Sequence, residues 1–214
     1  MLKLINIQKW YSNHHIFSIE ELTLPAGIYW LKGANGAGKS TFMKILAGLI
    51  PFKGEVFIDE KISLRKNPVH YRLLVNHAES EPVYPSFLTG NELVEFVSKL
   101  KKGTKELINE TRNILGIDDY LQNPIGSYSS GMLKKLSLLL AFIGNPKLIL
   151  LDEPLTTLDQ SSQKALCILI LQQRQINNTS FIITSHHDIE NNDIHFDKNF
   201  ILKDKQLLTV TQSL

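Results

Sequence analysis

A glycine-rich stretch followed by a lysine and two hydroxyl residues has the spacing of a phosphate-binding loop. Gly33 to Ser40 satisfies the pattern G-x-x-x-x-G-K-[ST]. Glycines let backbone N–H groups converge on phosphate oxygens, and a helix that starts at the loop adds partial positive charge there. Lys39 can reach the β- and γ-phosphates of a nucleotide, and the Ser40 hydroxyl can join a Mg²⁺ shell. The residues predicted to bind nucleotide in this loop are Gly33, Ala34, Asn35, Gly36, Ala37, Gly38, Lys39, Ser40 and Thr41.

Two adjacent acidic residues stand at the end of a continuous apolar run. Leu148 to Leu151 predicts a buried strand, and Asp152, Glu153 and Pro154 follow it. Ligands of parallel sheets bind at the carboxyl ends of the strands, so both carboxylates are expected near the phosphate loop. Asp152 is predicted to hold Mg²⁺, usually through water, and Glu153 to orient or deprotonate the attacking water. An isolated Asp-Glu-Pro could be a solvated turn, but a phosphate loop upstream favours the catalytic interpretation.

The elements that position the loop follow from hydrophobic periodicity. Apolar residues at helical spacing, from Phe42 to Leu49, predict a helix that Pro51 stops. A short buried strand is predicted at Leu73 to Val75. Alternating apolar and polar residues predict further strands at 2–8, 16–24, 28–32 and 54–59. The phosphate loop is thus expected between a strand and a helix.

The middle of the chain is predicted to be helical. Thr89 to Glu92 has capping-box spacing, and an apolar face follows it through Leu93, Phe96, Val97 and Leu100. A second helix is predicted from Leu107 to Leu115, ended by Gly116. Alternation of strand and helix then resumes, with a strand at 148–151, a helix at about 161–175, a strand at 181–184 and a β-ribbon at 200–210. The sequence therefore predicts one α/β domain over residues 1–214, with a helical subdomain at approximately 76–144.

Composition and charge narrow the class of protein. The formal net charge is only +2, with no block of five like charges, so nothing indicates a nucleic-acid groove. The N-terminus lacks the features of a secretion signal, and the apolar runs are far shorter than the roughly 20 residues that span a bilayer. The single cysteine, Cys167, allows no intrachain disulfide, which favours a cytoplasmic location.

Over essentially its full length the chain resembles the nucleotide-binding domain of ABC transporters. The resemblance implies a P-loop NTPase core of ABC ATPase type, with an antiparallel β subdomain and an inserted helical subdomain. It also implies ATP and Mg²⁺ as ligands and ATP hydrolysis as the activity. Ser129 and Gly131 match the family's LSGGQ-type signature and would contact the γ-phosphate held by the other subunit. Three positions, Tyr128, Ser130 and Met132, depart from that signature, so the match depends on two residues and their place in the chain. Read in isolation, the segment could be a helix cap.

Four further assignments depend on the same resemblance. Asp159 resembles the D-loop aspartate that aligns two subunits, and His186 resembles the switch histidine near the γ-phosphate, with His187 as the alternative. Tyr11 stands where the family places an aromatic ring that stacks on adenine, although Tyr11 could equally pack on an edge strand. Glu79 occupies the slot of the Q-loop glutamine, which contacts the γ-phosphate and Mg²⁺.

The resemblance also implies partners. Two copies, or this chain and a homologue, would close head to tail around two ATP molecules and power a separate transmembrane subunit at the inner face of the membrane. The signature and Glu79 favour export over import. The alternative is a soluble ABC-type ATPase that acts on chromosomes, DNA repair or ribosomes. Relatives of that kind carry long coiled-coil insertions or two such domains in one chain, and this sequence has neither.

Overall fold

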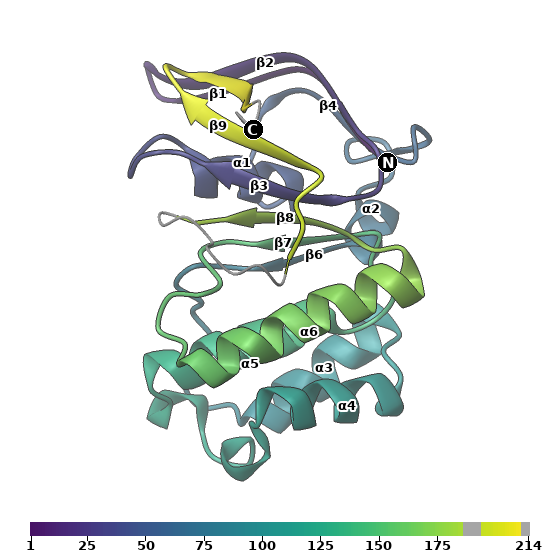
Figure 1. The fold of residues 1–214 in the computed structure, drawn as a ribbon, viewed down its shortest axis with the longest axis vertical. Helices are drawn as coiled ribbons and strands as arrows, with labels where there is room; N and C mark the ends of the chain where they lie inside the picture. The colour runs from purple at the N-terminus through teal and green to yellow at the C-terminus, as the bar shows by residue number, and fades with distance from the viewer. Residues whose placement is uncertain (186–193, 211–214) are drawn as a thin grey trace.

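The computed structural model describes residues 1–185 and 194–210. Its strands form one ten-stranded sheet in the order β5-β4-β1-β2-β10-β9-β3-β8-β7-β6 (Figure 1). The strands are β1 (Leu2–Tyr11), β2 (His14–Leu24), β3 (Ile28–Lys32), β4 (Lys53–Ile58), β5 (Ile62–Ser63), β6 (Val75–Ala78), β7 (Leu148–Leu151), β8 (Ser180–Thr184), β9 (Lys198–Lys203) and β10 (Gln206–Val210).

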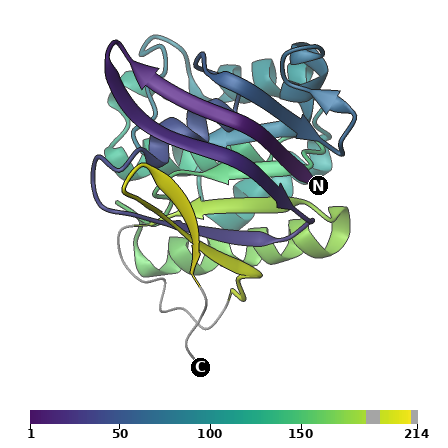
Figure 2. The same cartoon turned by 90° about the horizontal axis from the view of Figure 1, so that it is seen from above.

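The sheet has an antiparallel part and a parallel part. Strands β5, β4, β1 and β2 pair antiparallel, whereas β9, β3, β8, β7 and β6 pair parallel. The β9–β10 hairpin joins the two parts, because β10 also pairs with β2. Figure 2 shows the long β1–β2 hairpin from above, with the β9–β10 hairpin beside it. The carboxyl ends of β3, β7 and β8 consequently meet at one edge of the parallel part.

The helices divide between two hydrophobic cores. They are α1 (Lys39–Leu46), α2 (Pro68–Leu74), α3 (Gly90–Lys101), α4 (Lys105–Leu115), α5 (Ser130–Phe142) and α6 (Gln160–Asn177), with two short 3₁₀ turns before α5 (Asp118–Tyr120 and Ile125–Ser127). Helices α3 to α6 gather on one side of the parallel strands, and α1 lies on the other side with the antiparallel strands (Figure 1). Strand β7 serves both cores, since Ile149 and Leu151 pack in one and Leu148 and Leu150 in the other.

Most of the predicted elements are confirmed. Thr89 forms the predicted capping box with Glu92 at the start of α3, and α4 ends at Gly116, whose φ of 60° is left-handed. The β9–β10 turn lacks glycine, yet Asp204 and Lys205 both take positive φ, at 48° and 64°. A two-residue hairpin turn requires such angles, so this turn keeps its geometry at some cost in backbone strain.

Three details differ from the prediction. Leu73 and Leu74 end helix α2 rather than begin a strand, and β6 starts at Val75. Pro68 at the first helical position favours that helix, which the short apolar run concealed. Strand β6 belongs to the sheet, so the predicted boundary at residue 76 falls inside a strand and the helical block begins after Ala78. The third detail concerns α3, where Leu93 is buried but Phe96 and Leu100 are exposed.

Candidate active site

The phosphate-loop sequence lies between β3 and α1, as the pattern requires. Gly36 and Gly38 have φ values of 77° and 104°, in the left-handed region that favours glycine. At Gly38 a Cβ atom would also meet Ile16 Cγ2 at 2.9 Å. Helix α1 then starts at Lys39. The first turn of a helix leaves N–H groups with no acceptor within the helix, which makes this end a site for anions.

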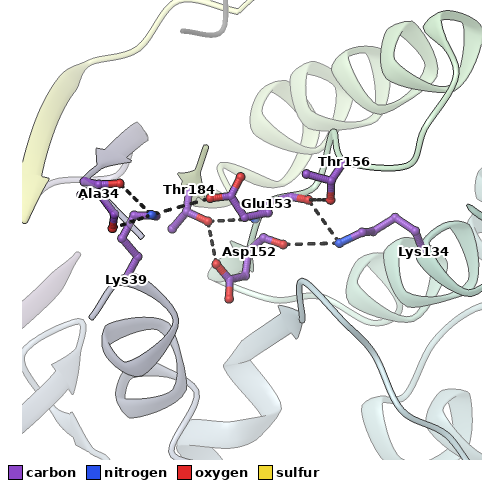
Figure 3. Close-up of polar contacts among 8 residues, drawn as sticks. Ala34, Lys39, Lys134, Asp152, Glu153, Thr156 and Thr184 are labelled. Carbon is purple, nitrogen blue, oxygen red and sulfur yellow. Dashed lines mark hydrogen bonds and ion pairs between the residues drawn. The ribbon is translucent and has the colours of Figure 1, made fainter. Parts of the chain in front are cut away.

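The Lys39 ammonium group lies at the centre of the loop. Its side chain is 6% exposed, and Nζ donates hydrogen bonds to the carbonyl oxygens of Gly33 at 2.8 Å and Ala34 at 3.3 Å (Figure 3). Glu153 Oε1 lies 3.8 Å from the same Nζ atom. Burial lowers the pKa of Lys39, and the charges of Glu153 and Asp152 partly oppose that shift. The loop thus holds a cation beside the acidic end of β7.

The two acidic residues are fixed by Thr184, the last residue of β8. Its Oγ1 accepts a hydrogen bond from the Glu153 backbone N–H at 2.8 Å and donates one to Asp152 Oδ1 at 2.7 Å (Figure 3). Asp152 is 1% exposed and Glu153 8% exposed. Glu153 has a φ of 48°, which is unfavourable for a residue with a Cβ atom. Strain of this kind persists where the surrounding structure fixes it, often at functional sites.

The loop and Glu153 line one cavity of about 570 Å³. A cavity of this size accommodates a small organic ligand. Predicted residues in its lining are Ala34, Asn35, Gly36, Gly38, Lys39, Ser40, Thr41 and Glu153. The remaining lining residues, which were not predicted to bind nucleotide, are Ile16, Ser80, Glu81, Thr156 and Thr157.

Gly33 and Ala37 of the loop lie outside this lining, and so do two nucleotide contacts predicted elsewhere in the chain, Tyr11 and Glu79. Tyr11 is 48% exposed, pairs with His14 at the end of the β1–β2 hairpin, and lies under the Lys9 ammonium group. Glu79 Oε2 lies 3.3 Å from Lys44 Nζ on α1, while its neighbours Ser80 and Glu81 line the cavity. Adenine stacking by Tyr11 and metal coordination by Glu79 therefore stay predictions.

The residues expected to act across a subunit interface are also outside the cavity of their own chain. Ser129 is the N-cap of α5, and its hydroxyl accepts a hydrogen bond from the Met132 N–H at 3.2 Å. At Gly131 a Cβ atom would meet the Thr157 carbonyl oxygen at 3.1 Å. Asp159 is the N-cap of α6. His186 and its alternative, His187, lie outside the described residues.

Two buried groups that hold the site together, Thr184 and Lys134, were not predicted from the sequence. Thr184 belongs to no sequence motif. Its contacts with the acidic residues arise only because β8 lies beside β7 in the sheet. Lys134 has a 1% exposed side chain on α5 and donates to the Glu153 carbonyl oxygen after β7 (Figure 3). It also donates to the Ser80 carbonyl oxygen after β6. No local pattern in α5 distinguishes Lys134 from its neighbour Lys135.

The family model described as ABC transporter matches residues 20–156, more than half of the chain. This chain belongs to the ABC transporter family. The match spans both the phosphate loop and the Asp152–Glu153 pair, and within the family the chain is an ATP-binding ATPase. The described residues include no helix that is long and apolar enough to cross a membrane.

Two curated relatives and one solved structure illustrate the similarity of this ABC chain to known proteins. The cytochrome c biogenesis ATP-binding export protein CcmA of Legionella pneumophila is 30% identical over 200 residues, which cover 92% of this chain and 98% of CcmA. ABC transporter A family member 10 of Arabidopsis thaliana is 32% identical over 77% of this chain, but this chain spans only 19% of its length. A dimeric ATP-binding cassette in a post-hydrolysis state with ADP and Pi has the same fold, with a TM-score of 0.80 and 21% identity over 97% of this chain and 96% of that one.

Proposed function

We propose that Glu153 is the residue that activates water for ATP hydrolysis. The main support for this role is the position of the Glu153 carboxylate, which faces the cavity 3.8 Å from the Lys39 ammonium of the phosphate loop. A triphosphate against the loop would bring its γ-phosphate to this carboxylate, and a water held by Glu153 would then lie in line for attack. Lys39 would offset negative charge on the phosphates. His186 would add a contact to the γ-phosphate.

Mg²⁺ fits the residues at the end of β7. Asp152 Oδ2 is buried and has no hydrogen-bond partner among the residues that the structure describes, and Ser40 contributes a hydroxyl at the cavity. No three carboxylate, histidine or cysteine groups of the described chain cluster into a metal cage. Mg²⁺ commonly uses one or two protein oxygens and takes its other ligands from water and substrate phosphates. Asp152 and Ser40 would hold the ion, which would neutralise charge on the β- and γ-phosphates.

A second subunit would complete the site. Ser129 is exposed at the N-terminus of α5 and lies away from the cavity of its own chain. A head-to-tail pair would bring the partner's α5 N-terminus, with its partial positive charge, against the γ-phosphate. Two solved cassettes of the same fold are described as dimeric, which supports the pairing of two chains. The pair would be a homodimer or a heterodimer with a homologue.

The transported cargo would pass through a separate transmembrane subunit. The segment between β6 and α3 exposes Val83 (91%) and Phe87 (78%), and α3 exposes Phe96 (60%) and Leu100 (57%) one turn apart. Large exposed apolar side chains are typical of protein interfaces. This segment follows Ser80 and Glu81 at the cavity, so it could carry a change at the nucleotide to the membrane subunit. The relative CcmA, whose name describes an export protein, favours export as the direction.

Site-specific cross-linking tests the membrane partnership. A photo-reactive p-benzoylphenylalanine at Phe96 should cross-link an integral membrane protein when the chain is purified from its native membranes. The same group at Ile176, which is 74% exposed on α6, provides the control. Cross-linking from position 96 alone supports the proposal, and equal products from both positions, or none, contradict it.

Sedimentation tests the pairing of subunits. Glu153→Gln with ATP and Mg²⁺ should sediment at twice the monomer mass, because bound ATP is no longer consumed. Adding Ser129→Arg to that variant should restore the monomer, since a bulky cation there would block the contact. A double variant that still pairs with ATP would remove Ser129 from the interface.

A further inference from the structure

Lys134 is a buried cation at the junction of three segments. Its side chain, on α5, is 1% exposed. Nζ donates to the carbonyl oxygens of Ser80 at 2.7 Å, Glu79 at 3.2 Å, Glu153 at 3.2 Å and Asp152 at 3.5 Å. Figure 3 shows it reaching the acidic residues from the side opposite to Lys39. One ammonium group thus gathers four main-chain oxygens.

These oxygens belong to the ends of two neighbouring strands. Ala78 of β6 pairs with Leu151 of β7, and the Asp152 N–H donates to the Ala78 carbonyl at 2.9 Å. After that last hydrogen bond of the ladder, the segment from β6 continues to Ser80 and Glu81 in the cavity wall, and the segment from β7 continues to Glu153. Lys134 connects these two segments just beyond the end of the β6–β7 ladder.

Burial of this ammonium group has a free-energy cost that the surrounding carbonyls must offset. Burial lowers the pKa of Lys134 to about 8, although the charges of Asp152 and Glu153 oppose the shift. An apolar residue at this position would pack into the core without such a cost. The reason for a lysine at this position must therefore lie in its hydrogen bonds to the four main-chain carbonyls.

The Glu153 backbone is constrained by three neighbouring side chains. Its N–H donates to Thr184 Oγ1, and its carbonyl oxygen accepts from Thr156 Oγ1 at 2.8 Å and from Lys134 Nζ. These bonds hold the residue at its unfavourable φ of 48°. That angle determines the direction of the carboxylate, which faces Lys39.

We propose that Lys134 is a positioning residue for ATP hydrolysis, which holds the Glu153 backbone in its active conformation and ties it to the Glu79–Ser80 segment. The proposal rests on the proposed role of Glu153. Because Ser129 is the N-cap of the helix that carries Lys134, the tie also fixes the N-terminus of α5 relative to the acidic residues. A shift of the Glu79–Ser80 segment would thereby reach both Glu153 and Ser129.

The test compares two lysines that donate hydrogen bonds to main-chain carbonyls, the buried Lys134 and the half-buried Lys101. Lys134→Met removes the cation and keeps the volume. Lys101→Met is the matched control, because Lys101 on α3 also donates to main-chain carbonyls, those of Arg72 and Val75, and its pKa is likewise lowered to about 8 by burial. Lys101 does not line the cavity. Both variants should lower the thermal unfolding midpoint.

Only Lys134→Met should impair the chemical step. We expect kcat to fall roughly 10- to 100-fold, the scale of a misplaced catalytic group, with the Kd for ATP changed by less than about threefold. Lys134→Gln, a shorter side chain that can hold one of the two segments, should have a kcat between those of Lys134→Met and the wild type. Lys101→Met should keep the wild-type kcat.

Three results would overturn the proposal. They are a Lys134→Met kcat within about twofold of wild type, a loss of kcat equal to that of Lys101→Met, or a weakened Kd with unchanged kcat. If Lys134→Met does not fold, a wild-type kcat in Lys134→Gln overturns it as well. Glu153→Gln in the same assay separates the two proposals, because wild-type hydrolysis by that variant would refute the role of Glu153 and not the structural tie.

Discussion

The Thr184 hydroxyl donates a hydrogen bond to Asp152 Oδ1 over 2.7 Å, while Asp152 Oδ2 is buried with no hydrogen-bond partner among the described residues. One carboxylate oxygen is thus fixed and the other is available for a ligand. A buried carboxylate oxygen is costly to leave without a partner, so a cation at this position would stabilise the site. The same hydroxyl accepts from the Glu153 N–H, which would couple the proposed positions of the metal and the attacking water.

Replacement of Thr184 by valine should disturb both metal binding at Asp152 and water activation by Glu153. The change leaves the shape nearly intact but deprives the Glu153 N–H and Asp152 Oδ1 of their partner, at a cost of about 1–3 kcal/mol of unfolding free energy. We expect the Mg²⁺ concentration for half-maximal ATPase activity to rise and kcat to fall. Thr179→Val is the control. Thr179 is equally buried, lies just before the opposite end of β8, and donates to the Pro146 carbonyl. Equal Mg²⁺ requirements in the two variants would contradict this role.

Glu153→Gln should bind ATP normally and hydrolyse it roughly two to four decades more slowly, the usual scale for loss of a general base. The amide preserves the size of the side chain but cannot accept a proton. Steady-state phosphate release and equilibrium ATP binding measure the two quantities separately. Glu81→Gln, which alters another carboxylate in the cavity wall, should change kcat far less. A Glu153→Gln rate near that of the wild type would exclude it as the base.

Lys39→Ala should weaken ATP binding by about 10- to 100-fold, because hydrogen bonds from a charged donor typically contribute about 1.5–3 kcal/mol. Its ammonium group would exchange the Gly33 and Ala34 carbonyls for phosphate oxygens when nucleotide enters. Titration with a fluorescent ATP analogue measures the change, and Lys105→Met, an exposed lysine on α4, is the control. An unchanged affinity would contradict the assignment of the loop.

Asp159 should contribute to stability in a pH-dependent way. Hydrogen bonds from Ser161 and Ser162 at the start of α6 hold its pKa well below the ordinary value of 3.8. Because the pKa is lower in the folded chain, this contribution is complete above about pH 4 and is lost as the pH falls further. Asp159→Ala should therefore lower the unfolding midpoint at pH 7, and its difference from wild type should shrink at pH 3. A difference that grows toward pH 3 would contradict the N-cap role.

Local patterns in the sequence predicted the parts of the site that a single segment supplies. The phosphate loop combines its glycines, lysine and helix start within nine residues, and the Asp152–Glu153 pair follows its own strand. Both were expected at one edge of the sheet, and Lys39 and Glu153 do face each other there. Likewise Thr89 and Glu92 form a cap through neighbours three residues apart.

Local patterns could not predict the contacts between segments that are far apart in the sequence. Thr184 contacts Asp152 across 32 residues of sequence, and Lys134 contacts the Ser80 carbonyl across 54. Nothing local distinguishes that threonine or that lysine from others in the chain. The segment after β6 illustrates the same limit, because no local pattern indicated that Ser80 and Glu81 line the cavity.

A crystal structure of the Glu153→Gln variant grown with ATP and Mg²⁺ tests the central claim most directly. It should show the triphosphate against the α1 amides and Lys39, with the metal between Ser40 and Asp152 Oδ2 and a water between the γ-phosphate and residue 153. Ser129 of a second copy should contact the same γ-phosphate. Nucleotide bound elsewhere on the chain at saturating ATP, with this cavity closed by side chains, would contradict the account.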